Sequence, residues 1–190
     1  MKELKRALIV FGILVVITGV IYPLTVTGIA QLTMSHRANG SLVTVNGNVV
    51  GSELIGQQWT SPKYFHGRPS ANNYDASNSG GTNLGPSSAD LEKTVIERVA
   101  KVRSENGLAA NATVPADLVT ASASGLDPDI SPESALLQVR RVAAARSLAP
   151  SAVEHLVTVN TRKPFLDIWG QSRVNVLELN IALDKLSETP

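Results

Sequence analysis

Residues 7–35 read ALIVFGILVVITGVIYPLTVTGIAQLTMS, a run without a charged side chain that follows Lys2, Lys5 and Arg6 and decides the fold. A bilayer core of about 30 Å is crossed by about 20 apolar residues, because a helix rises about 1.5 Å per residue. This run of about 29 residues is long enough to cross once. Every later apolar stretch is interrupted by charge, Pro or Gly. The sequence therefore predicts a short N-terminus, residues 1–6, one transmembrane helix, residues 7–35, and one soluble domain, residues 36–190.

An alternative interpretation of this run is a secretory signal peptide, in which Gly28, Ile29 and Ala30 would supply the small residues of a cleavage point. The apolar region of a signal peptide is usually about 7 to 15 residues long, so the length favours a retained anchor. Cations stay preferentially on the cytoplasmic side, and the three N-terminal ones outnumber the single Arg37 just beyond the run. We therefore expect a single-pass protein of a bacterial inner (plasma) membrane, with a cytoplasmic N-terminus and a periplasmic or otherwise extracytoplasmic domain.

Small residues form two neighbouring stripes along the predicted helix. Gly12 and Gly19 lie seven residues apart, as do Thr18 and Thr25. Because small residues let a second helix approach closely within lipid, the stripes predict partner helices in the membrane. Pro23 removes a backbone donor and should kink the helix. The alternative is that these are ordinary residues of a helix that contacts only membrane lipid.

Composition excludes several classes of function. The chain carries 17 Lys and Arg against 16 Asp and Glu, and three of the cations belong to the N-terminus, so the soluble part is close to neutral. A nucleic-acid partner would need a basic surface, and none is predicted. The absence of Cys from the sequence excludes disulfides, thiolate metal sites and a Cys nucleophile. About 150 residues suffice for one domain with a modest core.

The soluble part combines helical and strand signals. Residues 42–50 alternate around Asn46-Gly47, which favours a two-residue hairpin turn. Residues 62–86 show neither helical nor strand periodicity. They contain many turn formers, together with aromatic and basic residues. Long irregular segments inside domains are usually functional or disordered, and the embedded Tyr64, Phe65 and Arg68 favour an ordered recognition loop over a disordered one.

Capping signals place the helices. The predicted elements are a helix from Ser87 or Ser88 to Gly107, a helix capped by Ser131 with Pro132 at its first position, a helix from Ser151 with Glu154 completing a capping box, a strand over Phe165–Trp169, and a last helix over Val174–Leu186. The last segment also fits strand alternation. We expect an α+β domain, with a β-hairpin, short strands and about four helices, on a single N-terminal transmembrane helix.

Motifs for autonomous chemistry are absent from the sequence. The glycine-rich residues 80–85 lack the Lys and the Ser or Thr of a phosphate-binding loop. The Asp-Lys-Thr-Gly sequence that forms the aspartyl phosphate of a P-type ATPase is missing. A triad of Ser124 and Asp127 with His66 or His155 lacks a nucleophile elbow, and Ser-Gly-Leu-Asp-Pro is an ordinary turn sequence. The three His residues show no zinc-site spacing. No catalytic or metal-binding residue is predicted.

Motifs in a fixed order nevertheless resemble one family over nearly the whole chain. They are Thr18–Leu24, Ala30-Gln31, Gly51-Ser52, Leu54–Gln57, Tyr64-Phe65, Gly67–Ala71, Ser79–Gly81, Asn83–Pro86, Val119–Ser122, Ser124–Pro128, Ile130–Pro132, Gln138, Arg141–Ala143, Ala145-Arg146 and Arg173–Leu177. The sequence is similar to the C chain of the Kdp-type potassium-transporting ATPase, a small single-span subunit.

The resemblance implies a non-hydrolytic subunit of a high-affinity potassium uptake pump. The implied partners are a channel-like potassium-binding subunit, a P-type ATPase catalytic subunit and a small membrane peptide. The family is described as a catalytic chaperone that raises the ATP affinity of the pump, and Gln138 matches the Gln proposed to help hold nucleotide. No tightly bound cofactor is implied, and ATP would enter through the ATPase subunit. The alternative role for Gln138 is a turn or helix contact within the fold.

The family resemblance and the charges around the anchor disagree about whether this domain contacts ATP. Nucleotide and the ATPase domains are cytoplasmic, whereas the charges around the anchor place this domain outside. We therefore expect a structural mechanism, in which the domain covers the external potassium entrance through the loop of residues 64–86 and the turn of residues 122–132. The interface residues would be Tyr64, Phe65, Arg68, Ser124, Gly125 and Asp127, together with the small residues of the anchor. A stand-alone anchored surface enzyme or binding protein is the alternative.

Overall fold

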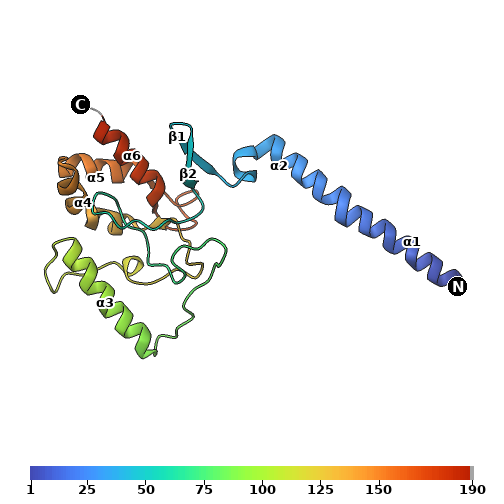
Figure 1. The fold of residues 1–190 in the computed structure, drawn as a ribbon, viewed down its shortest axis with the longest axis horizontal. Helices are drawn as coiled ribbons and strands as arrows, with labels where there is room; N and C mark the ends of the chain where they lie inside the picture. Colours follow the sequence, from blue (N-terminus) through green and yellow to red (C-terminus); the bar gives the residue numbers. More distant parts are fainter. Residues whose placement is uncertain (189–190) are drawn as a thin grey trace. The chain divides into compact units, whose positions relative to one another are not determined.

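The computed structural model describes residues 1–188 and divides into two compact units with the boundary between Val50 and Gly51. The first unit begins with a continuous helical segment, shown in blue in Figure 1. It comprises α1 (Lys2–Val16), the π-helical turn η1 (Ile17–Ile21) and α2 (Tyr22–Ala38). Within the described residues, Lys2–Ala38 is the one helix long and apolar enough to span a membrane. The predicted membrane-spanning helix is therefore observed as a helix of sufficient length.

The helix is irregular next to Pro23. The wider π turn η1 directly precedes it, and the N–H of Tyr22 donates to the carbonyl of Ile17 at the end of that turn. A π turn is one way to accommodate a missing backbone donor, because it shifts the hydrogen-bond register by one residue. The break in helical dihedral angles lies further along, at Met34.

The small residues of the anchor lie open on the helix surface. A Cβ added at Gly12 or Gly19 would meet no atom within 4 Å beyond its two chain neighbours and the backbone of its own helix. The hydroxyls of Thr18 and Thr25 donate to the carbonyls of the residues four positions earlier, at 2.8 and 2.7 Å. These Thr side chains are therefore satisfied within their own helix. Their hydroxyls are therefore not free donors.

A β-hairpin follows the helix, as predicted. Strands β1 (Leu42–Val45) and β2 (Asn48–Ser52) pair with each other, and Asn46 and Gly47 occupy the turn with φ of 50° and 81°. Positive φ at both turn residues is the geometry that Asn-Gly favours. The sequence prediction of this hairpin is confirmed.

The second unit contains four α-helices and a small antiparallel sheet within the described residues. The helices are α3 (Ala89–Glu105), α4 (Pro132–Arg146), α5 (Pro150–Val159) and α6 (Val176–Glu188), and a short 3₁₀ turn η2 spans Ala116–Leu118. The strands β3 (Asp129–Ile130), β4 (Thr161–Arg162) and β5 (Arg173–Asn175) lie in the order β3-β5-β4. The predicted α+β class is confirmed.

The core of this unit lies where α4, α5 and α6 pack together (Figure 1). Its buried apolar residues are Phe65, Ile130, Ala135, Val139, Val142, Ala143, Val153, Val157, Val174, Val176, Leu179 and Leu183. Phe65 comes from the long irregular loop and is 0% exposed. The loop is therefore fastened to the helical core by one of its own aromatic side chains.

Helix starts follow local signals at two of the three predicted positions. The hydroxyl of Ser88 accepts the N–H of Leu91 at the start of α3, and that of Ser131 accepts the N–H of Ser134 at the start of α4. The predicted capping box of Ser151 and Glu154 is wrong, because α5 begins at Pro150 and has no side-chain cap. Proline presets the helical φ at its own position, so it starts this helix instead.

The predicted strand over Phe165–Trp169 is also wrong. These residues form a tight turn, in which Leu166 and Asp167 have positive φ and one isolated bridge joins Phe165 to Trp169. The true strands β4 and β5 flank the turn and pair with each other. The apolar side chains of these residues are exposed. The predicted last helix, by contrast, is confirmed as α6.

Candidate functional site

Two segments that the sequence singled out lie against each other in the second unit. The long loop before α3 contacts the turn of residues 122–128 through an ion pair between Arg68 Nη1 and Asp127 Oδ2 at 2.9 Å. The hydroxyl of Ser70 donates to the carbonyl of Gly125 at 2.7 Å, and the N–H of Gly80 donates to the carbonyl of Ser124 at 2.9 Å. The structure thus brings Arg68, Ser124, Gly125 and Asp127 together as one joint within the domain.

Gly125 is required by the geometry of this joint. Its φ is +68°, and an added Cβ would collide with the side chain of Asn72 and the carbonyl oxygen of Gly80. Most side chains are strained at positive φ, and the close approach of Asn72 excludes even a methyl group. The Ser-Gly-Leu-Asp-Pro sequence is therefore a turn that receives the loop.

Buried amide side chains clasp two consecutive residues of the loop. Asn180 of α6 accepts the N–H of Phe65 at 2.8 Å and donates to its carbonyl at 3.0 Å. Gln138 of α4 does the same for His66, accepting its N–H at 2.8 Å and donating to its carbonyl at 3.1 Å. Each amide replaces the partner strand that these backbone groups would otherwise need. We name Asn180 and Gln138 together the amide clamp.

Gln138 has no spare hydrogen-bonding capacity. Its Nε2 also donates to the carbonyl of Ser134, and its Oε1 also accepts from Arg141 Nη2 at 2.6 Å. The side chain is 1% exposed. An amide offers two donors and two acceptor positions, and all four are occupied within the domain. The structure therefore places the proposed nucleotide residue as a structural contact between α4 and the loop.

Two arginines of α4 extend the hold on the loop. Arg141 Nη1 donates to the carbonyls of Pro62 and Tyr64 at 2.7 and 3.0 Å. Burial lowers the pKa of Arg141, although the guanidinium remains charged at neutral pH. Arg146 lies 4.6 Å from the ring centroid of Tyr64 and pairs with Asp184 at 2.7 Å. These contacts account for the order of a segment whose sequence consists mainly of turn formers.

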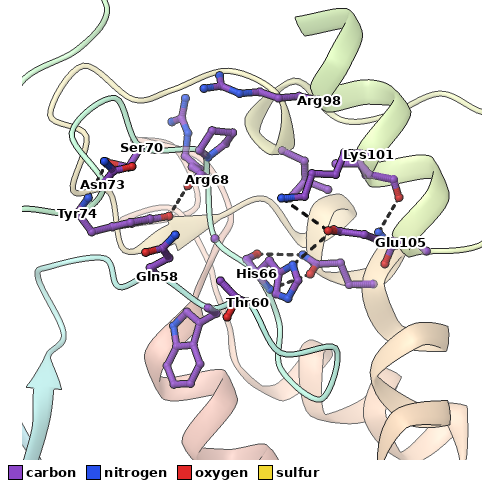
Figure 2. A pocket seen from close by; sticks show the side chains of 17 residues that line it. Gln58, Thr60, His66, Arg68, Ser70, Asn73, Tyr74, Arg98, Lys101 and Glu105 are labelled. Carbon is purple, nitrogen blue, oxygen red and sulfur yellow. Dashed lines mark hydrogen bonds and ion pairs between the residues drawn. The ribbon is translucent and has the colours of Figure 1, made fainter. Parts of the chain in front are cut away.

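A cavity of about 250 Å³ opens between this loop and α3. Figure 2 shows Lys101 and Glu105 of α3 on one wall, facing Arg68 and Tyr74 of the loop, with His66 between them. Burial, together with the charge of Asp127, raises the pKa of Tyr74. The phenol hydroxyl donates to the carbonyl of Arg68, which explains its inward orientation.

The surroundings of His66 lower its pKa. Burial is the main cause that lowers the pKa of His66, and the positive charge of Arg141 lowers it further. Its Nε2 lies 3.1 Å from the carbonyl oxygen of Ser61, and its Nδ1 lies 3.7 Å from the carboxylate of Glu105. The imidazole is therefore part of the wall between the loop and α3.

The described contacts of Ser124, Asp127 and His66 do not join these three residues into a triad. Ser124 accepts the N–H of Leu126, and Asp127 is paired with Arg68. His66 contacts Ser61 and Glu105 instead of either residue. No group of three or more His, Cys, Asp or Glu side chains suited to a metal ion occurs among the residues described.

Sequence reasoning missed the residues that fasten the loop. Asn180, Arg141 and Arg146 were not proposed as site residues, although the last two lie in motifs that the resemblance includes. The available signal was a buried helix face that carries a polar residue, as at Asn180 between Leu179 and Ile181. Tyr64 and Phe65 were proposed for a partner interface, but Phe65 is in the core and supports the loop from beneath.

Comparison with known proteins places the chain among membrane transport proteins. The family model described as "KdpC: K+-transporting ATPase, c chain" matches residues 4–185. A potassium-transporting ATPase KdpC subunit of Gemmatimonas aurantiaca is 53% identical, with 100% of this chain and 96% of that protein covered. Proteins of the same name from Rhodopseudomonas palustris (strain BisB5) and Mycobacterium bovis are 50% and 49% identical, covering 97% of this chain and 97% and 99% of their own lengths. This chain belongs to the family of K+-transporting ATPase c chains.

Proposed function

We propose that this chain is the non-hydrolytic accessory subunit of a high-affinity, ATP-driven potassium uptake complex. The family assignment over nearly the whole chain supports this role. The sequence lacks the phosphorylation motif of a P-type ATPase, so hydrolysis would belong to a partner subunit. The partners would be a potassium-binding subunit, the P-type ATPase subunit and a small membrane peptide. The chain needs no cofactor of its own in this role.

The proposed location is the outer face of the plasma membrane. The helix Lys2–Ala38 follows an N-terminus with three cations, and cations favour the cytoplasmic side. The second unit is then extracytoplasmic, on the side from which potassium is taken up. The open surface at Gly12 and Gly19 supports packing of this helix against helices of the partner subunits.

We further propose that the chain raises the ATP affinity of the ATPase subunit without contacting nucleotide. The observation that carries this proposal is the state of Gln138, whose two donors and two acceptor positions are all occupied within the domain. Nucleotide binding by this side chain would break its hold on His66 and leave buried backbone groups unpaired. Such groups are costly to leave unsatisfied in a domain interior.

The coupling to ATP is then conformational. The domain binds one state of the complex more tightly than the other, and the same state has the higher affinity for ATP. A coupling of about 1–3 kcal/mol changes an affinity about 5- to 150-fold, which is the usual range for coupled sites. The joint around Gly125 and the amide clamp keep the loop rigid, so that the domain can distinguish between two states of its partner.

The test compares ATP binding by complexes with and without this chain. We expect the KM for ATP of the ATPase to rise at least several-fold when the chain is omitted, and a photoactivatable ATP analogue to label the ATPase subunit alone. Labelling of this chain at a peptide that contains Gln138, competed by ATP, would contradict the indirect mechanism. An unchanged KM in the complex lacking the chain would contradict any effect on ATP affinity.

A further inference from the structure

The cavity between the loop and α3 is short of hydrogen-bond acceptors. Among the described residues, a buried side-chain nitrogen or oxygen lacks a hydrogen-bond partner in Trp59, Arg68 and Asp129. The first two of these residues line the cavity, and their unpartnered atoms, Trp59 Nε1 and Arg68 Nε, are donors. A buried donor without an acceptor is costly. The lining therefore favours a ligand that supplies acceptors.

The lining of the cavity also carries more cations than carboxylates. Arg68, Arg98 and Lys101 line it, whereas Glu105 is the one carboxylate among its lining residues. That carboxylate is already shared, because it lies 3.7 Å from Lys101 Nζ and 3.7 Å from His66 Nδ1. A cleft lined mainly by one sign of charge attracts ions of the opposite sign. The charge of the lining therefore favours an anion.

Arg98 is a cation without a carboxylate partner among the described residues. Its Nη1 donates to the carbonyl of Val119 at 3.0 Å, whereas Arg68 is paired with Asp127. Burial lowers the pKa of Arg98, although the guanidinium remains charged at neutral pH. Figure 2 shows the side chains of Arg98 and Lys101 extending from α3 toward the loop. A guanidinium withdrawn from water is best compensated by a carboxylate, whose planar shape it matches with two donors.

The size and the apolar residues of the cavity restrict the ligand further. Its volume of about 250 Å³ is below the range of about 300–1,000 Å³ that is usual for drug-sized ligands. Pro69, Val102 and Leu118 line it beside the polar groups. An inorganic anion would make no use of this apolar surface, whereas the hydrocarbon part of an organic acid would bury it. The lining therefore fits a small organic acid.

We propose that this cavity binds a small organic carboxylate, whose carboxyl group pairs with Arg98 and whose apolar part lies against Val102 and Leu118. The site goes beyond the proposed role as a pump subunit and does not depend on it. Gln138 forms part of the wall, because its donors and acceptors are occupied within the domain.

A bound carboxylate would also fasten α3 to the rest of the domain. This helix has no fully buried side chain, and it is held by polar contacts such as that of Arg103 Nε with the carbonyl of Ala112 at 2.9 Å. A ligand held between α3 and the loop adds a further link between them. We therefore expect the ligand to slow hydrogen exchange in residues 89–105 more than in α5, which already contributes Val153 and Val157 to the core.

The binding test uses para-fluorobenzoate, which joins a carboxylate to a small apolar ring. Its binding to the full-length protein in a non-ionic detergent is followed by the broadening of its fluorine NMR resonance, with the detergent alone as the blank. The control ligand is para-fluorobenzamide, which has nearly the same shape and no charge. We expect saturable binding of the acid and at least about tenfold weaker binding of the amide, because charge-assisted hydrogen bonds are the stronger ones.

Variants locate the probe in the cavity. Arg98→Gln should weaken binding of the acid at least about tenfold. Because Arg98 also holds the carbonyl of Val119, Lys101→Gln is the second variant; its side chain is 73% exposed, so the fold should be unaffected and binding should weaken severalfold. Val102→Phe should prevent binding by filling the cavity while every cation stays in place. The matched control is Lys93→Gln, which removes an exposed cation of α3 outside the cavity and should leave the affinity unchanged.

Four results would overturn the proposal. Equal affinity for the acid and the amide would show that charge is not recognised. Acid binding that both Arg98→Gln and Lys101→Gln leave unchanged would place the probe elsewhere. Displacement of the probe by inorganic phosphate at equal concentration would assign the cavity to an inorganic anion. The absence of saturable binding would show that solvent alone satisfies the unpaired donors.

Discussion

Replacing Gln138 by Ala separates a structural role from a nucleotide-binding role. The substitution removes both hydrogen bonds to the backbone of His66, for which no other partner is present in the described structure. A buried polar group left unpaired costs about 1–3 kcal/mol. Two such groups would cost about 2–6 kcal/mol. Because the neighbouring cavity can admit water to one of them, we expect a loss in the lower half of that range, about 2–4 kcal/mol.

This loss is large compared with the stability of a typical domain, about 5–15 kcal/mol. For a unit of this size, about 1 kcal/mol shifts the thermal midpoint by roughly 3–4 °C, so the Tm should fall by roughly 10 °C. The assay is thermal unfolding of the full-length protein in detergent. The variant Trp169→Phe leaves Trp59, which contacts Tyr64 and the core, as the reporter of unfolding.

Gln58→Ala is the matched control, because Gln58 is exposed and lines the same cavity. Its Tm should change by less than about 2 °C, as surface substitutions usually change stability by under about 0.5 kcal/mol. The reasoning is refuted if Gln138→Ala unfolds like the unsubstituted protein while the KM for ATP of the assembled complex rises. That combination would indicate a direct nucleotide contact.

Three further predictions concern the joint, the imidazole and the anchor. Gly125→Ala should destabilise the second unit by at least about 2 kcal/mol, from positive φ and collision with Asn72, and an unchanged Tm would contradict this geometry. Because the pKa of folded His66 lies below its usual 6.5, stability should be complete above pH 6.5 and fall as the pH drops through the lowered pKa. In unfolding measured at a series of pH values, His66→Gln should reduce this loss of stability at acid pH. An equally steep loss in the variant would show that another group causes it. Gly12→Leu with Gly19→Leu should reduce copurification with the partner subunits without changing the Tm of the domain, and an intact purified complex would show that this surface is not a packing face.

Local sequence signals predicted the elements whose causes are local. An uncharged run gave the long helix, Asn46-Gly47 gave the hairpin, and Ser88 and Ser131 gave two helix starts. The prediction for α5 failed because Pro150 outweighed the capping pattern that follows it. The strand prediction for residues 165–169 also failed, since a short apolar and aromatic segment can form an exposed turn instead.

The fastening of the long loop depends on contacts distant in sequence. Asn180 lies 115 residues from Phe65, and Gln138 lies 72 residues from His66. The sequence shows only a polar residue among apolar ones on a helix, as at Asn180, and that signal does not identify the backbone groups that the amide binds. The family resemblance singled out Gln138 and implied a role for it in nucleotide binding. The structure shows that its side chain binds the backbone of His66.

The side of the membrane on which the second unit lies is the central claim, because it determines whether contact with ATP is excluded. The sequence contains no Cys, so one engineered thiol at the exposed Ala110 reports the location without background from this chain. Ala110→Cys should react with a membrane-impermeant thiol reagent in intact cells, and Glu3→Cys should react only after lysis. Reaction of Ala110→Cys only after lysis would place the domain in the cytoplasm and contradict the account.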